Sequence, residues 1–207
     1  ERLSAVLTGH FVYHPWQGER KKVDFYVVKG ILDGLFNLLG LSKKIEYKRG
    51  NAEGLHPGRT ADIYLNGTFI GFVGELNPQV EKEYDLDETY VFELKLAELF
   101  QFEAEPVVYE AIPRFPSITR DIAFVVDQKV QAEELQKTIV AAGGRLLKEI
   151  SLFDVYEGGH LEKGKKSVAF SLRYYDPERT LTDHDVAAVH EKVIKSVEEK
   201  FSAVLRS

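Results

Sequence analysis

The chain of 207 residues is 44% hydrophobic and 29% charged, with a formal net charge of −6, a composition typical of one or two globular domains. It contains no cysteine, so disulfides, thiolate metal ligands and a cysteine nucleophile are excluded, in agreement with a reducing compartment. No apolar run approaches the ~20 residues that cross a bilayer, so no contact with a membrane is expected. The chain begins at Glu1 and has no methionine, which predicts that it is a piece of a longer polypeptide.

The charge is spread unevenly along the chain. Residues 1–112 hold 12 Lys+Arg against 18 Asp+Glu, whereas residues 113–207 hold 15 of each. A segment without net positive charge does not bind nucleic acid by general attraction to phosphates. Any RNA contact in the second half is therefore expected to involve a small surface that is complementary in shape.

Residues 1–105 are predicted to form a domain of mixed helix and strand. An apolar run over residues 3–8 indicates a buried strand, and Asp24 is placed to cap a helix that runs to about Leu39. Asn66-Gly67 separates two strand-like runs, and because both turn positions favour positive φ it predicts a β-hairpin. A further strand is expected over residues 90–96, followed by a linker over residues 106–112.

Residues 113–207 show periodicities in the order strand, helix, strand, strand, helix, strand. The strands are expected over residues 118–126, 147–156, 167–175 and 203–206, and the first helix over residues 132–142. Thr182 is placed to cap the second helix, with Asp185 three residues on as a variant of the capping box. This βαββαβ order predicts one four-stranded sheet with both helices on a single face.

Alternation along the strands predicts which side chains face away from those helices. In the third strand, Ser167, Ala169, Ser171 and Arg173 alternate with larger apolar residues that are expected to lie under the helices. The open face is further assigned Ala123 of the first strand and Asp154 and Tyr156 of the second. Phe153 and Val155 are expected to be buried. Ile150 and Leu152 break the alternation, which indicates a β-bulge or an edge contact.

Neither a metal site nor a catalytic constellation is predicted. His10 and His14 are four residues apart, but Pro15 follows and the glutamate of a metalloprotease helix is absent. No nucleophile elbow and no glycine-rich phosphate loop leading into a helix are present. No catalytic residue and no bound cofactor are therefore expected within these residues.

Several separated motifs resemble one family. Pro113-Arg114-Phe115-Pro116, the run from Leu152 to Gly158 and the run from Arg179 to Asp183 resemble the ferredoxin-fold anticodon-binding domain that ends the β chain of bacterial phenylalanyl-tRNA synthetases. His56-Pro57-Gly58-Arg59 and the run from Gly74 to Pro78 resemble the end of the catalytic-like domain that precedes it.

The resemblance implies an α+β architecture, with part of a class II synthetase-like antiparallel sheet domain followed by a ferredoxin-like domain over residues 113–207. It implies a cytoplasmic α2β2 parent enzyme that joins phenylalanine to tRNA(Phe) with ATP and magnesium, with the chemistry in the α chain. The first domain would serve the α/β interface, and the second would read the anticodon near Ala123, Asp154, Tyr156 and Ser167. Arg173, on the open face, and Arg120, which could touch a phosphate, are added as candidate RNA-binding residues.

Two alternatives to this function stay open. One is a structural module that reads no RNA, and the other is a small-molecule-binding protein whose site lies in the first half. Two of the site residues also have an ordinary structural interpretation. Tyr156 could be a common strand tyrosine, and Asp154 could be a cross-strand partner for Arg173.

Overall fold

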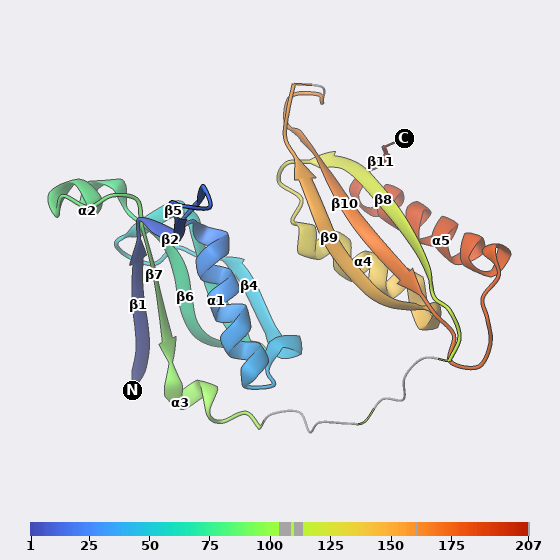
Figure 1. Ribbon diagram of the computed structural model, residues 1–207, viewed down its shortest axis with the longest axis horizontal. Coiled ribbons are helices and arrows are strands. Elements are labelled where there is room, and N and C mark those ends of the chain that lie inside the picture. The colour runs from blue at the N-terminus through green and yellow to red at the C-terminus, as the bar shows by residue number, and fades with distance from the viewer. Residues whose placement is uncertain (104–108, 110–113, 160, 207) are drawn as a thin grey trace. The chain divides into compact units, whose positions relative to one another are not determined.

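The computed structural model describes residues 1–103, 109, 114–159 and 161–206 and divides the chain into two compact units, Glu1–Tyr109 and Glu110–Ser207 (Figure 1). Of the linker predicted over residues 106–112, only Tyr109 lies within the described residues, where it is exposed. None of the described helices is both long enough and apolar enough to span a membrane.

The first unit is built on a five-stranded antiparallel sheet in the order β1-β7-β6-β5-β4. These strands are Arg2–Thr8 (β1), Ile45–Arg49 (β4), Leu55–Leu65 (β5), Thr68–Leu76 (β6) and Thr89–Lys95 (β7). The helix α1, Phe25–Leu38, runs along one face of this sheet (Figure 1). The predicted hairpin is present, with Asn66 and Gly67 both at positive φ between β5 and β6.

The helix α1 forms where the sequence predicted it because its first turn is capped and its apolar side chains share one face. The Asp24 carboxylate accepts a hydrogen bond from the backbone N–H of Val27 at 2.7 Å, which satisfies a donor that has no partner within the helix. Leu32 and Phe36 are fully buried on the sheet side. They pack in one core with residues of β5, β6 and β7, including Ile63, Val73, Phe92 and Leu94.

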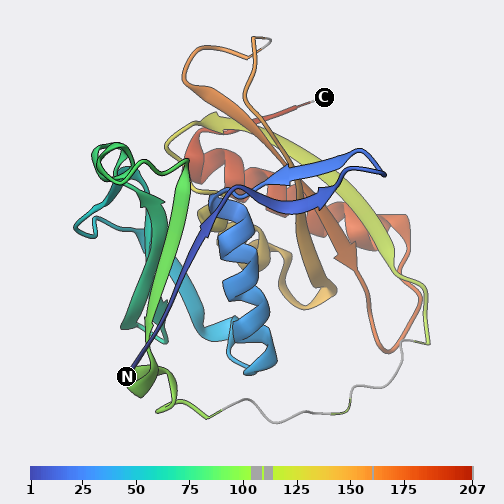
Figure 2. The same cartoon turned by 60° about the vertical axis from the view of Figure 1, so that its left-hand side comes forward.

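Several short elements of the first unit were not predicted. The strands β2 (His10–His14) and β3 (Glu19–Lys22) form a separate two-stranded ribbon. Figure 2 shows this ribbon leaving the sheet beside the N-terminal end of α1, and the Val23 N–H closes its base by donating to the Gly9 carbonyl at 3.0 Å. The other elements that were not predicted are the strand β4 and the short helices Ser42–Lys44 (η1), Pro78–Glu83 (α2) and Leu96–Leu99 (α3).

The second unit has the predicted βαββαβ order. Its elements are Ile118–Asp127 (β8), Ala132–Gly143 (α4), Gly144–Leu146 (η2), Leu147–Tyr156 (β9), Lys165–Tyr174 (β10), Asp183–Phe201 (α5) and Val204–Leu205 (β11). The sheet order β11-β8-β10-β9 is that of a ferredoxin-like fold, and both helices lie on one face (Figure 1). The fold is therefore α+β with antiparallel sheets, as predicted.

The core of this unit lies between the sheet and its two helices. Phe124 of β8, Phe170 of β10 and Ile139 of α4 are fully buried there with Val193 of α5. Burying one such side chain is worth about 1.5–3 kcal/mol, which explains why the apolar halves of the strands and the helix stripes decide the topology. No helix among the described residues covers the other sheet face, so that face is the one on which other contacts can form (Figure 1).

A β-bulge at Phe153 corrects the prediction for the second strand. The register runs from Ala169 opposite Asp154 directly to Phe170 opposite Leu152, so Phe153 is the extra residue. Leu152 and Ile150 consequently fall on the helix side, which explains why they broke the alternation. Because β9 is an edge strand, Phe153 is 58% exposed and Val155 is 46% exposed, and the prediction that both are buried is wrong.

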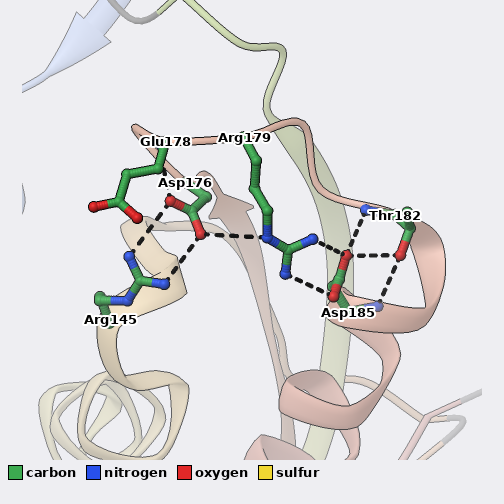
Figure 3. A network of polar contacts seen from close by, with 6 residues as sticks. All are labelled: Arg145, Asp176, Glu178, Arg179, Thr182 and Asp185. Carbon is green, nitrogen blue, oxygen red and sulfur yellow. Dashed lines mark hydrogen bonds and ion pairs between the residues drawn. The ribbon is translucent and has the colours of Figure 1, made fainter.

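A polar network ties the loop after β10 to the start of α5 (Figure 3). Asp176 is 2% exposed and accepts from the Arg145 guanidinium at 3.0 and 3.4 Å. Arg179 donates to both carboxylate oxygens of Asp185 at 2.8 and 2.9 Å. The Asp185 carboxylate also accepts from the Thr182 backbone N–H, and the Thr182 hydroxyl accepts from the Asp185 N–H, which completes the predicted capping box. The network fixes where α5 begins.

Candidate nucleic-acid interface

Strand pairing brings together the four residues that the resemblance selected. Ala169 of β10 lies opposite Ala123 of β8 on one side and opposite Asp154 of β9 on the other. Ser167, two residues away on the same face, lies opposite Tyr156. Directly paired residues have Cβ atoms ~5 Å apart, so Ala123, Asp154, Tyr156 and Ser167 form one cluster across three neighbouring strands.

The cluster is less open than alternation predicted. Asp154 is exposed, and Ala123 and Tyr156 are half-buried. Ser167 is only 2% exposed and Ala169 only 7% exposed, so the expectation that both are open to solvent is corrected. The two small residues form a packed floor, above which the Asp154 carboxylate and the Tyr156 ring are the groups that remain accessible.

Arg206 covers this floor, and the sequence interpretation did not include it among the site residues. Its backbone N–H donates to the Ala123 carbonyl at 2.8 Å, and its guanidinium donates to the Ser167 hydroxyl at 3.2 Å. The guanidinium carbon also lies 5.4 Å from the centre of the Tyr156 ring, which is within the range of a cation–π contact. Arg206 therefore contacts three of the four clustered residues. Among the contacts that the structure describes, it is the one cationic side chain that touches the cluster.

A sequence signal for Arg206 exists. Val204 pairs with Val125 of β8, which belongs to the helix-free face, so the residue two positions later returns to that face. Alternation in the strand predicted over residues 203–206 separates Val204 and Arg206 from Ala203 and Leu205, and the pairing with β8 then places Arg206 beside the cluster.

The hydroxyl end of the Tyr156 ring occupies the space that a side chain at position 158 would fill. A Cβ atom at position 158 would lie 2.3 Å from the Tyr156 Oη and 2.4 Å from Cζ, far inside van der Waals contact. Only glycine leaves room for the ring in this orientation. The loop after β9 thus lies directly against the aromatic surface of the site, and the Leu161 N–H donates to the Gly158 carbonyl at 3.0 Å.

The two arginines predicted as further RNA contacts lie apart from the cluster. Arg173 is on the same face, but it is six residues from Ser167 along β10, roughly 20 Å at the usual rise of a strand. It pairs with Glu149 at 3.2 Å and donates to the Ser117 hydroxyl at 3.0 Å, so the alternative that Asp154 pairs with Arg173 is not what the structure shows. Arg120 lies on the helix side, where it pairs with Asp183 at the start of α5.

The first unit holds a cavity of about 500 Å³ between the start of α1, the β5 segment around Arg59 and the start of β7. Its lining charges Arg59 and Glu88 are already paired: Arg59 donates to the buried Glu75 carboxylate behind the cavity at 2.6 Å and to Glu88 at 3.5 Å, and the Tyr90 hydroxyl donates to Glu88 at 2.5 Å. Burial and the neighbouring Glu88 raise the pKa of Tyr90 above its ordinary range. Within the described residues, no three His, Cys, Asp or Glu side chains are grouped to hold a metal ion.

The same region joins the two motifs that the resemblance used in the first half. A Cβ at Gly74 would lie 2.7 Å from the Thr60 hydroxyl and 3.0 Å from the Arg59 carbonyl. The motif around His56 and the motif around Gly74 therefore pack directly against each other in β5 and β6, and the Arg59–Glu75 pair lies between them. Their joint role in the fold is structural.

Comparison with known proteins gives two family matches and many relatives. Residues 113–206 match the ferredoxin-fold anticodon binding domain, and residues 1–96 match the phenylalanyl-tRNA synthetase β chain CLM domain. The relatives include the phenylalanine–tRNA ligase β subunits of Geobacillus kaustophilus (63% identical), one strain of Bacillus cereus (55%) and Bacillus subtilis (53%). Each match covers all of this chain and 26% of the relative, so the chain spans about a quarter of the length of the proteins it matches.

The predicted resemblance is thus confirmed in both halves of the chain and in the same order. The match to the ferredoxin-fold anticodon binding domain also agrees with the sheet order and with the single helical layer of the second unit. With its CLM domain followed by a ferredoxin-fold anticodon-binding domain, the chain belongs to the bacterial phenylalanine–tRNA ligase β subunit family, whose C-terminal region it represents.

Proposed function

We propose that the second unit reads the anticodon of tRNA(Phe) with the helix-free face of its sheet. The observation that carries this proposal is the cluster of Tyr156, Asp154, Ser167 and Ala123 on adjacent strands, with Arg206 bound across it. Sequence-specific RNA recognition uses unstacked bases that stack on flat side chains and present their edges to polar groups. The cluster offers one aromatic ring, one carboxylate and one guanidinium over a floor of small residues.

Each group in the cluster has a distinct task. A base stacks on the Tyr156 ring, an interaction worth about 1–3 kcal/mol. The Asp154 carboxylate accepts hydrogen bonds only, so it selects a base edge that presents N–H donors. The Arg206 guanidinium supplies positive charge to a phosphate and a second flat surface beside the ring. Ser167 and Ala169 form the packed floor beneath these groups, and the Ser167 hydroxyl holds the Arg206 guanidinium in place.

The whole-enzyme role follows from the family. We propose that the chain acts within a cytoplasmic phenylalanine–tRNA ligase of α2β2 form that uses ATP and magnesium, while the residues described here carry out no chemistry. The first unit would then contact the α chain. The face of its sheet away from α1 supports this role, because it presents Val6 at 68% exposure beside the half-buried Val91 and Phe72.

The experiment that tests anticodon reading is a fluorescence-anisotropy titration of the 207-residue chain with labelled anticodon stem-loops. One loop carries the phenylalanine anticodon and the other a scrambled anticodon, each at two salt concentrations. We expect tighter binding of the phenylalanine loop and loss of this preference in Tyr156→Ala. Equal and strongly salt-dependent binding of both loops would contradict base reading, because phosphate attraction alone behaves that way.

Arg206 gives a second arm of the same titration. Arg206→Ala is expected to weaken binding and to reduce the slope of log K against log salt by about 0.7–0.9, the value for one phosphate contact. Arg206→Lys keeps the charge, so it should keep the salt slope while losing part of the affinity that comes from the flat guanidinium. Identical behaviour of wild type and both variants would remove Arg206 from the site.

A further inference from the structure

The ribbon β2–β3 of the first unit carries the strongest unexplained chemistry in the described part of the chain. Residues 10–22 hold Arg20, Lys21 and Lys22 against the single acid Glu19, whereas the rest of residues 1–103 hold 9 Lys+Arg against 15 Asp+Glu. Every residue of β3 is exposed. No ion pair to its three basic side chains occurs among the residues that the structure describes. The ribbon is thus a positive feature on a unit that is negative elsewhere.

Flat side chains are concentrated on the same ribbon. Trp16 is 80% exposed at its tip, and Phe11 and Tyr13 are each about half exposed. His10 and Tyr13 lie side by side with ring centres 5.7 Å apart. The Arg20 guanidinium lies 5.4 Å from the centre of the Tyr13 ring, because Tyr13 pairs with Arg20 across the two strands. One face therefore combines an imidazole, a phenol and a guanidinium.

This combination fits single-stranded RNA better than a protein surface. Proteins bind single strands by pairing positive side chains, which follow the backbone, with aromatic rings on which bases stack. The centre of a protein–protein interface is dry, apolar and depleted of lysine. The exposed large apolar residues of the ribbon are all aromatic, with no exposed leucine, isoleucine or valine among them, and two adjacent lysines lie beside them.

We propose that the β2–β3 ribbon is a second RNA-binding element, which takes a single-stranded segment by stacking on Trp16 and Tyr13 and by phosphate contacts to Arg20 and Lys22, which share the face of Tyr13. This inference goes beyond anticodon reading, because it concerns a different unit and a different set of residues. A failure of one proposal leaves the other standing.

Trp16 makes the proposal directly measurable, because it is the only tryptophan of the chain. Its fluorescence reports on the ribbon alone, without a label. The experiment titrates the 207-residue chain with an unlabelled 12-nucleotide oligouridylate, which forms no duplex. We expect saturable quenching of the Trp16 emission and a slope of log K against log salt of about −1.4, as two phosphate contacts on a single strand give.

A matched pair of charge reversals provides the control. Lys22→Glu on the ribbon is expected to weaken the quenching about three- to tenfold, whereas Lys82→Glu on α2, which is also an exposed lysine of the first unit, should leave it unchanged. Tyr156→Ala should leave it unchanged as well, which separates this site from the anticodon site.

Three results would overturn the proposal. The first is no quenching by the RNA. The second is equal weakening by Lys22→Glu and Lys82→Glu, which would indicate only the overall charge of the unit. The third is saturable quenching by an oligoglutamate peptide but not by RNA, which would assign the ribbon to an acidic protein partner instead.

Discussion

The contact between Gly158 and Tyr156 yields the sharpest test of the anticodon site. In Gly158→Ala the new methyl group would lie 2.3 Å from the Tyr156 Oη. Ordinary van der Waals contact begins near 3.4 Å, so the phenol end of the ring must move by about 1 Å. The ring is the stacking surface of the proposed site and also the surface that Arg206 covers. The substitution thus displaces the platform without removing any group that contacts RNA.

The expected loss follows from the value of one stacked base, about 1–3 kcal/mol. A shifted ring keeps part of that contact, so we expect the dissociation constant for the phenylalanine stem-loop to rise about 5- to 30-fold. Anisotropy titration measures it, and a thermal scan checks that the variant is folded. Gly159→Ala is the matched control, because a Cβ at position 159 meets nothing within 4 Å, and its binding should equal that of wild type.

A double-mutant cycle decides whether the effect passes through the ring. In the Tyr156→Ala background there is no ring to displace, so Gly158→Ala should add no further loss of affinity. An equal loss in both backgrounds would show that Gly158 acts through the loop and not through Tyr156. Wild-type binding by Gly158→Ala alone would refute the idea that the ring position matters.

Two pH-dependent predictions concern the stability of the second unit. Burial, aided by the charge of Arg120, lowers the pKa of His190, so the stability that this residue contributes is complete above its ordinary value of 6.5 and is lost as pH falls further. His190→Gln should therefore flatten the urea-unfolding midpoint between about pH 7.5 and 5, and an unchanged pH profile would exclude this role. Hydrogen bonds from Arg179 and Thr182 hold the pKa of Asp185 well below its ordinary value of 3.8. Asp185→Asn should thus lower the thermal midpoint at pH 7, with the difference shrinking as pH falls below 3.8, and a constant difference would indicate lost packing instead.

Local signals were sufficient for much of the fold. The capping residues Asp24 and Thr182 predicted where α1 and α5 begin, and both caps are formed. Asn66 and Gly67 predicted the β5–β6 turn, because few other residue pairs accept positive φ at both positions. These predictions depend on neighbours within a few residues. The order of periodicities then limited the second unit to one sheet with a single helical layer.

The missed features of the sheets depend on strand pairing or on register. The ribbon β2–β3 has a register shift between His10 and Val12 and no apolar alternation, so it gave no strand pattern. The bulge at Phe153 reversed the faces of its neighbours, which is the effect that a one-residue slip has on any strand. Sequence showed that the alternation failed near Leu152, but only the partner strand shows which residue is extra.

The candidate site illustrates why the residues of a sheet face can be predicted while a side chain that packs on it from a distant segment is missed. Alternation within each strand correctly grouped Ala123, Asp154, Tyr156 and Ser167, because the side-chain period of a strand is local. Arg206 joins them only through the pairing of β11 with β8, which connects residues about 80 positions apart in the sequence. That pairing buries Ser167 and places a guanidinium over the Tyr156 ring. Because the same chain end both completes the sheet and covers the aromatic surface, any change that detaches β11 should expose that surface and remove its positive charge together.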